Sequence, residues 1–66
     1  MFATVKWFND QKGYGFLVPQ TGGKDVFVHI SALMKSKLTT LKEGQKVEFD
    51  LQMGKKGDEA VNVRLV

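Results

Sequence analysis

Three side chains in one short stretch are of the types that form hydrolytic triads: Asp25, His29 and Ser31. In such a triad the carboxylate orients the imidazole through a direct hydrogen bond. The stretch has the composition of a β-strand, in which the four-residue separation of Asp25 and His29 spans about 13 Å at roughly 3.3 Å per residue. The two groups cannot meet unless the strand is broken, so we expect that the protein is not an enzyme.

The residues that would form a metal site or a cofactor site are also scarce in the sequence. The sequence has one histidine and no cysteine, whereas zinc sites draw several ligands from these residue types. The run GYG begins like a dinucleotide-binding loop, but the third glycine is missing and the strand-like FLVP follows where a helix should start. We therefore expect no metal and no other cofactor.

Aromatic side chains alternate with small or aliphatic ones in two nearby runs, KGYGFL and VFVHI. Successive side chains of a strand point to opposite faces, so alternate positions share a face. Four rings then lie opposite the aliphatic residues: Tyr14, Phe16, Phe27 and His29. An exposed patch of this kind usually marks a binding surface. Two alternatives stay open, because the rings could cover a second core beneath a long loop, and His29 could be an inert surface residue.

Flat aromatic faces bordered by cations suit single-stranded nucleic acid. Every base has a π-face, and each stacked base contributes about 1–3 kcal/mol. Three lysines lie beside the aromatic residues in sequence and would hold phosphates: Lys6, Lys12 and Lys24. Lys55 and Lys56 could add phosphate contacts at a later turn, although such a pair is as often just a solvated loop.

Trp7 and Phe8 are adjacent, so strict alternation cannot place both on the aromatic face. A β-bulge or a strong twist in the first strand would bring Trp7 to that face and leave Phe8 half buried at its margin. Gly13 ends the NDQKG turn, where a positive φ is expected. Gly15 leaves an inward position without a side chain, where a small barrel must bend tightly.

Five runs have the composition or the alternation of β-strands: ATVKWFN, YGFLVP, KDVFVHI, QKVEFDLQM and EAVNVRLV. Polar, glycine-containing turn signals separate them. Alternation predicts one apolar face in each of the last two runs, formed by Val47, Phe49, Leu51 and Met53 and by Val61, Val63 and Leu65. The sequence therefore predicts a single all-β domain over residues 1–66, a small antiparallel barrel.

The segment SALMKSKLTTLKEG interrupts the strand pattern between the third and fourth runs. We expect one helical turn at Ser31–Leu33, followed by a long loop. A full helix over residues 31–44 is the alternative.

Composition narrows the class of protein further. The net charge of +3 and the isoelectric point near 9.4 suit a polyanionic partner. The chain begins without the pattern of a signal peptide, and no apolar run approaches the roughly 20 residues that cross a membrane. The absence of cysteine favours a reducing compartment, so we expect a cytoplasmic protein with no membrane partner.

Several motifs together resemble those of the bacterial cold-shock domain proteins: KWFN, KGYGFL, DVFVHISAL, LKEGQKVEF and GDEAVNV. The resemblance extends from about Val5 to Val63, and KGYGF and VFVHI are similar to the family's first and second ribonucleoprotein motifs. It implies a five-stranded OB-type barrel that binds single-stranded RNA and DNA. It also implies an RNA chaperone that influences transcription or translation, including in the cold response.

Carried over position by position, the family's ligand-facing residues fall on Lys6, Trp7, Lys12, Tyr14, Phe16, Asp25, Phe27 and His29. Two positions depart from the family pattern, since Ile30 and Leu38 stand where aromatic residues are usual. The resemblance therefore implies an aromatic surface smaller by two rings. If Ile30 and Leu38 flank that surface, each offers apolar contact but no π-face.

Two other readings of the same residues compete. The RNA-recognition-motif fold shares the start of the KGYGF signature, but it needs two helices and an aromatic residue where Pro19 stands. A protein-interaction module could use the same aromatic patch against a partner protein. We expect a monomer, because nothing in the sequence signals oligomerisation.

Overall fold

A computed structural model describes residues 1–54 and 57–66 of the chain. The predicted phosphate contacts Lys55 and Lys56 lie outside the described residues. The elements are, in chain order, β1 (Phe2–Asn9), β2 (Tyr14–Pro19), β3 (Val26–His29), α1 (Ile30–Met34), β4 (Lys46–Gly54) and β5 (Gly57–Leu65). The prediction of an all-β fold with five strands is confirmed.

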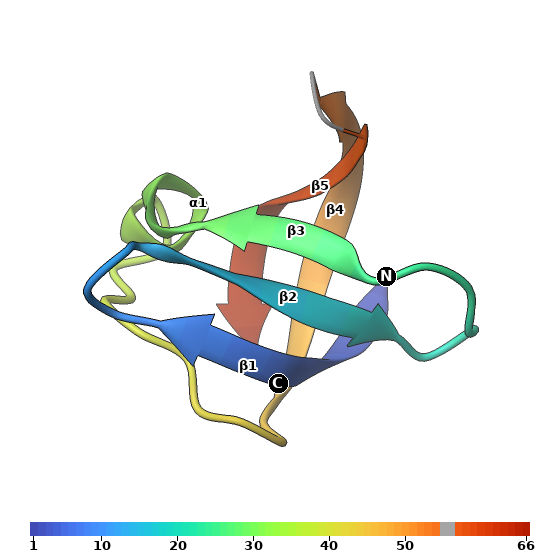
Figure 1. Cartoon of the computed structure of the whole chain (residues 1–66), viewed down its shortest axis with the longest axis horizontal. Helices are drawn as coiled ribbons and strands as arrows, with labels where there is room; N and C mark the ends of the chain where they lie inside the picture. The colour runs from blue at the N-terminus through green and yellow to red at the C-terminus, as the bar shows by residue number, and fades with distance from the viewer. Residues whose placement is uncertain (55–56) are drawn as a thin grey trace.

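The strands close into a barrel in the order β1-β2-β3-β5-β4, with β4 returning to β1 (Figure 1). Four of the strand pairings are antiparallel, as predicted. The fifth corrects the prediction, because β3 and β5 run parallel, with Phe27 opposite Glu59 and Val28 opposite Ala60. The connection through α1 and the long loop reverses the chain direction before β4, and this allows the parallel contact.

Aliphatic side chains from every strand fill the interior. The fully buried core includes Val5, Leu17, Leu33, Val28, Val47, Phe49 and Val63. Strands β1 to β4 contribute at alternate positions, which is the physical consequence of the two-residue period of a strand. No polar side chain is buried among the described residues.

The alternation predicted for β4 and β5 is wrong in part. Val47 and Phe49 are fully buried, but Leu51 is 45% exposed and Met53 is 81% exposed. The reason is visible in Figure 1, where the distal ends of β4 and β5 rise beyond the barrel as a two-stranded hairpin. Alternation predicts which side chains share one face of a strand. In the distal half of β4 that face lies beyond the barrel, so its side chains have no interior in which to be buried.

The error in β5 has a different cause. Glu48 pairs with Arg64 and Asp50 with Val61, so two steps along β4 match three along β5. The additional residue makes a β-bulge, and Asn62 within it has a φ of 53°. The inward positions are consequently Ala60 and Val63, whereas Val61 is half buried and Leu65 is 49% exposed.

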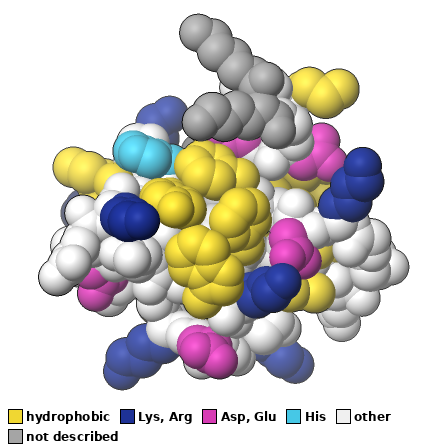
Figure 2. Space-filling model, in the orientation of Figure 1, with side chains coloured by type: hydrophobic (Ala, Val, Ile, Leu, Met, Phe, Trp, Pro, Cys, Tyr) yellow, Lys and Arg dark blue, Asp and Glu magenta, His cyan; other side chains and the backbone are white. Residues whose placement is uncertain are grey.

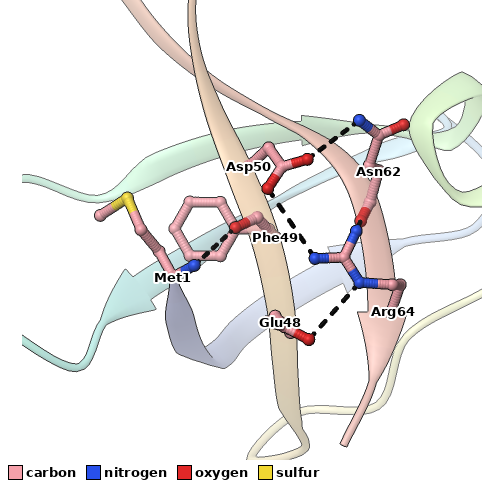
Figure 3. A network of polar contacts seen from close by, with 6 residues as sticks. All are labelled: Met1, Glu48, Phe49, Asp50, Asn62 and Arg64. Atoms are coloured by element: carbon pink, nitrogen blue, oxygen red, sulfur yellow. Dashed lines mark hydrogen bonds and ion pairs between the residues drawn. The ribbon is translucent and has the colours of Figure 1, made fainter.

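A polar network covers the outside of this bulge (Figure 3). The guanidinium of Arg64 lies 3.5 Å from Glu48 and 3.8 Å from Asp50, and it donates a hydrogen bond to the Asn62 carbonyl. The Asn62 amide donates in turn to Asp50 at 3.0 Å. The charged groups are well exposed, and such pairs contribute little free energy. The network links the bulged segment of β5 to the neighbouring strand β4.

The predicted single helical turn is confirmed as α1, with its boundaries one residue further at each end. Ala32 and Leu33 anchor it to the core. The loop that follows is tied back at Leu38, whose amide donates to the Leu33 carbonyl, and at Thr40, whose hydroxyl donates to Asp10. In the part of the chain described, no helix has the length and apolar character needed to cross a membrane.

Candidate nucleic-acid interface

The outer face of β1 changes register at Lys6. Val5 pairs with Leu17 and Trp7 pairs with Phe16, so Lys6 is an additional residue without a partner on β2. This is the β-bulge predicted for the first strand. Because the bulge interrupts alternation, Lys6 and Trp7 are both exposed, whereas Phe8 is half buried and packs against the core.

Five rings gather on the outside of β1, β2 and β3. We call them the aromatic platform: Trp7, Tyr14, Phe16, Phe27 and His29. The strand register brings them together, because Trp7 pairs with Phe16, Phe16 with Phe27, and Tyr14 with His29. Figure 2 shows the resulting hydrophobic patch, with the histidine at its border and charged side chains around it.

Neighbouring rings of the platform lie close together. The ring centroids of Trp7 and Phe16 lie 5.3 Å apart, those of Phe16 and Phe27 5.9 Å, and those of Phe27 and His29 6.5 Å. Tyr14 is close to parallel with Phe27, at 27°, and lies edge-on to Trp7, at 68°. The ring planes of the platform are thus inclined to one another and do not form a single flat surface.

The alternative of a second core beneath the long loop is wrong. None of the five rings belongs to the buried core, and Trp7 remains 36% exposed. The loop instead folds over the barrel end, where Leu38 is half buried and packs against the core. Nothing described in the structure covers the platform, so its apolar surface is available to a ligand.

His29 ends β3 and caps α1. Its Nδ1 accepts a hydrogen bond from the Ser31 amide at 3.1 Å and lies 3.0 Å from the Ser31 hydroxyl. The neutral ring in this arrangement carries its proton on Nε2. The bond fixes the imidazole plane at 29° to the Phe27 ring, so His29 extends the platform as a further stacking surface.

Asp25 takes no part in a triad with these residues. Its carboxylate accepts a hydrogen bond from the Lys6 ammonium at 2.8 Å, in an ion pair that crosses β2. Both side chains are substantially exposed, at 53% and 36%, so the pair contributes little to stability. An ammonium has three N–H donors, and Lys6 therefore keeps two for a phosphate group.

Lys12 and Lys24 border the platform from opposite sides. The Lys12 amide is held by the Asn9 side chain at 2.9 Å, in the turn that Gly13 completes with a φ of 75°. Lys24 lies at a hollow of about 280 Å³ beside Phe16 and Phe27. Both lysines are exposed, so each can meet a polyanion that crosses the rings.

Gly57 and Asp58 line that same hollow, and sequence reasoning missed them. They come from β5, which reaches the platform only because β3 and β5 pair in parallel. The sequence indicates that β5 is a strand, but it does not indicate which strand lies beside it. Only the pairing of β3 with β5 would have identified these two residues.

The remaining predicted site residues lie at the margin. Ile30 begins α1, is half buried, and donates its amide to the Gly13 carbonyl at 2.8 Å. Leu38, expected in a loop with nothing to bury it, packs against the core instead. Among the described residues, no group of three or more His, Cys, Asp or Glu side chains could hold a metal ion.

Comparison with known proteins identifies the family. The model of the 'Cold-shock' DNA-binding domain matches residues 1–66. The chain belongs to this family. The relatives include Cold shock-like protein CspC of Shigella flexneri, 58% identical over 62 residues that cover 94% of this chain and 90% of the relative. Cold shock-like protein CspC of Escherichia coli K12 is 56% identical over the same coverage. Cold shock-like protein CspJ of Salmonella typhimurium is 56% identical over 59 residues, covering 89% and 84% of the two chains.

Membership of the cold-shock domain family decides the class of function. The chain is a nucleic-acid-binding protein of the single-stranded, RNA-chaperone type and not an enzyme. Its closed five-stranded sheet agrees with the OB-type barrel that the resemblance implies. A protein-interaction module using the same patch is not favoured.

Proposed function

We propose that this cold-shock domain binds single-stranded RNA and DNA on the aromatic platform, with unpaired bases stacked on its rings. The observation that carries the proposal is the cluster of five rings on the outside of three adjacent strands, two of them exposed and three half buried, with neighbouring centroids 5.3–6.5 Å apart. A base has two π-faces whatever its sequence, so stacking supports binding to many transcripts.

Phosphate contacts complete the proposed interface. Lys6, Lys12 and Lys24 lie around the rings and would follow the backbone of the bound strand. Each phosphate that is neutralised releases condensed counterions, which favours binding at low ionic strength. Lys55 and Lys56 stay a prediction as further contacts of this type.

Chaperone activity follows from selective binding to the unpaired state. A ligand that binds one state and not the other stabilises that state by RT ln(1 + [L]/Kd). A platform that accepts unpaired bases therefore shifts weak RNA hairpins towards the open form. Such a shift can act on transcription or translation, and it matters most in the cold, where hairpins are more stable.

We also propose that the protein acts as a monomer in the cytoplasm, without a metal or another cofactor. The closed order of strands supports the monomer, since within the barrel each strand already pairs with two other strands of the same chain. Lack of cysteine supports a reducing compartment.

Salt dependence tests the proposed interface. The logarithm of the association constant for a single strand should fall linearly with the logarithm of salt concentration. The slope should be about 0.7 per phosphate neutralised, or roughly 2 for three lysines. Fluorescence titrations at several salt concentrations measure it. A slope near zero would contradict phosphate contacts and favour an apolar protein partner.

A further inference from the structure

A second hollow lies on the outer face of the barrel, away from the platform residues. Its volume is about 530 Å³, and it is lined by Phe2, Thr4, Val18, Gln20, Lys46 and Val66. That volume falls within the range of about 300–1,000 Å³ typical of ligand sites. None of these residues belongs to the aromatic platform or was predicted to bind a ligand.

The hollow continues the surface on which the platform lies. On β2 the outward positions follow one another as Tyr14, Phe16 and Val18, and Val18 pairs with Thr4 on β1. Val18 lies two residues past Phe16, or about 7 Å along the strand. The hollow therefore begins within reach of the next nucleotide of a strand that leaves the platform across Phe16.

The chemistry of the hollow repeats that of the platform. The Phe2 side chain is 47% exposed, so an aromatic surface is available for stacking. Val18 is 38% exposed beside it and adds apolar contact. Lys46 lies opposite Thr4 on β4 and supplies a cation. A ring, an aliphatic wall and an ammonium suit a base and its phosphate.

The ion pair between Lys6 and Asp25 lies between the two surfaces. It crosses β2 at the level of Leu17, between Phe16 and Val18. Asp25 is balanced by Lys6, and Lys6 keeps two free N–H donors. A phosphate that links a base on Phe16 to a base in the hollow would pass directly over this ammonium.

We propose that the hollow at Phe2, Val18 and Lys46 is an additional nucleotide subsite, which extends the single-strand track by one base beyond the platform. The inference rests on the proposed function of the platform. It commits to the continuing strand as the occupant because the surface is continuous with the platform and carries the same combination of ring and cation.

A length series tests the subsite. Oligothymidylates of about 4 to 10 nucleotides, within the site sizes known for OB folds, are titrated against wild type, Phe2→Ala and Lys46→Gln while Trp7 fluorescence is followed. The three proteins should bind the shorter oligonucleotides equally. Wild-type affinity should then rise once more with length, and Phe2→Ala should lose that step, about fivefold or more. Lys46→Gln should lower the salt slope by about 0.7 for the longer oligonucleotides alone.

An abasic residue identifies the base that fills the hollow. Removing the terminal base at one end of the longest oligonucleotide should weaken wild-type binding as much as Phe2→Ala does, and the two changes combined should add little. Removing the base at the other end should leave the effect of Phe2→Ala intact. If Phe2→Ala does not fold, Lys46→Gln still tests the subsite, because Lys46 is exposed and its replacement should not disturb the fold.

Two results would overturn the subsite. Equal affinities of all three proteins at every length would show that the strand does not use the hollow. A loss that is the same for the shortest and the longest oligonucleotides would place the effect in the platform. Failure of the wild type to bind any oligonucleotide is a separate result, because it overturns the function proposed for the platform itself.

Discussion

Phe27→Ala should weaken the binding of a single-stranded oligonucleotide by about 1–3 kcal/mol, the loss expected for one stacked base. Phe27 lies at the centre of the platform. The centroid of its ring is 5.8 Å from that of Tyr14, 5.9 Å from that of Phe16 and 6.5 Å from that of His29. Removing its ring therefore takes away one stacking surface and the support of three others. Phe16→Ala should have an effect of the same size.

Val28→Ala is the matched control on the same strand. Val28 is fully buried, and its truncation should lower the free energy of unfolding by about 2 kcal/mol through lost transfer energy and a cavity. That is a large fraction of the roughly 3–10 kcal/mol expected for a domain of this size. Phe27→Ala should cost far less stability, and folded Val28→Ala should still bind. If denaturant melts show Phe27→Ala to be the more destabilising, the assignment of faces on β3 is wrong.

Gly15→Ala should lower both stability and affinity. A Cβ at Gly15 would lie 2.3 Å from the Trp7 carbonyl oxygen and 2.7 Å from the Phe8 Cα. Both contacts are with backbone atoms, so β1 must move at the bulge that directs Trp7 outward. Overpacking of this kind costs about 1–3 kcal/mol. Because Trp7 moves with the backbone, the free protein's fluorescence should change together with its affinity.

Gly22→Ala is the control that distinguishes backbone strain from the steric clash expected at Gly15. A Cβ at Gly22 would have no atom within 4 Å, but its φ is +87°. Alanine there should cost about 1–2 kcal/mol of conformational strain while leaving Trp7 fluorescence and oligonucleotide affinity unchanged. If Gly15→Ala also left both unchanged in the folded protein, the close approach of β1 and β2 would not position Trp7.

The platform was predictable because its signals are local. Alternation within β2 and β3 assigns Tyr14, Phe16 and Phe27 to one face, and both strands follow the simple two-residue period. The adjacent pair Trp7 and Phe8 signalled the β1 bulge, since two neighbouring aromatic residues cannot satisfy one face. The structure confirms this bulge at Lys6.

Other features depend on contacts that no local pattern records. The bulge at Asn62 lies in a run whose apolar residues alternate perfectly. That alternation predicts that Val61 points into the barrel, whereas in the structure Ala60 is the buried residue. The exposure of Met53 follows from the length of the hairpin relative to the barrel. Gly57 and Asp58 reach the platform only through the parallel pairing of β3 with β5. Leu38 is half buried through a loop conformation that its own sequence does not dictate.

The most direct test of the account is a titration of Trp7 fluorescence with a single-stranded oligonucleotide and with its duplex of equal length. Trp7 is the one tryptophan of the chain and part of the platform, so bases that stack on the platform should quench it. Paired bases already stack on one another, so the duplex should bind much more weakly at the same salt concentration. Equal affinity for the duplex and the single strand, or binding of the single strand without any change in Trp7 emission, would contradict stacking on the aromatic platform.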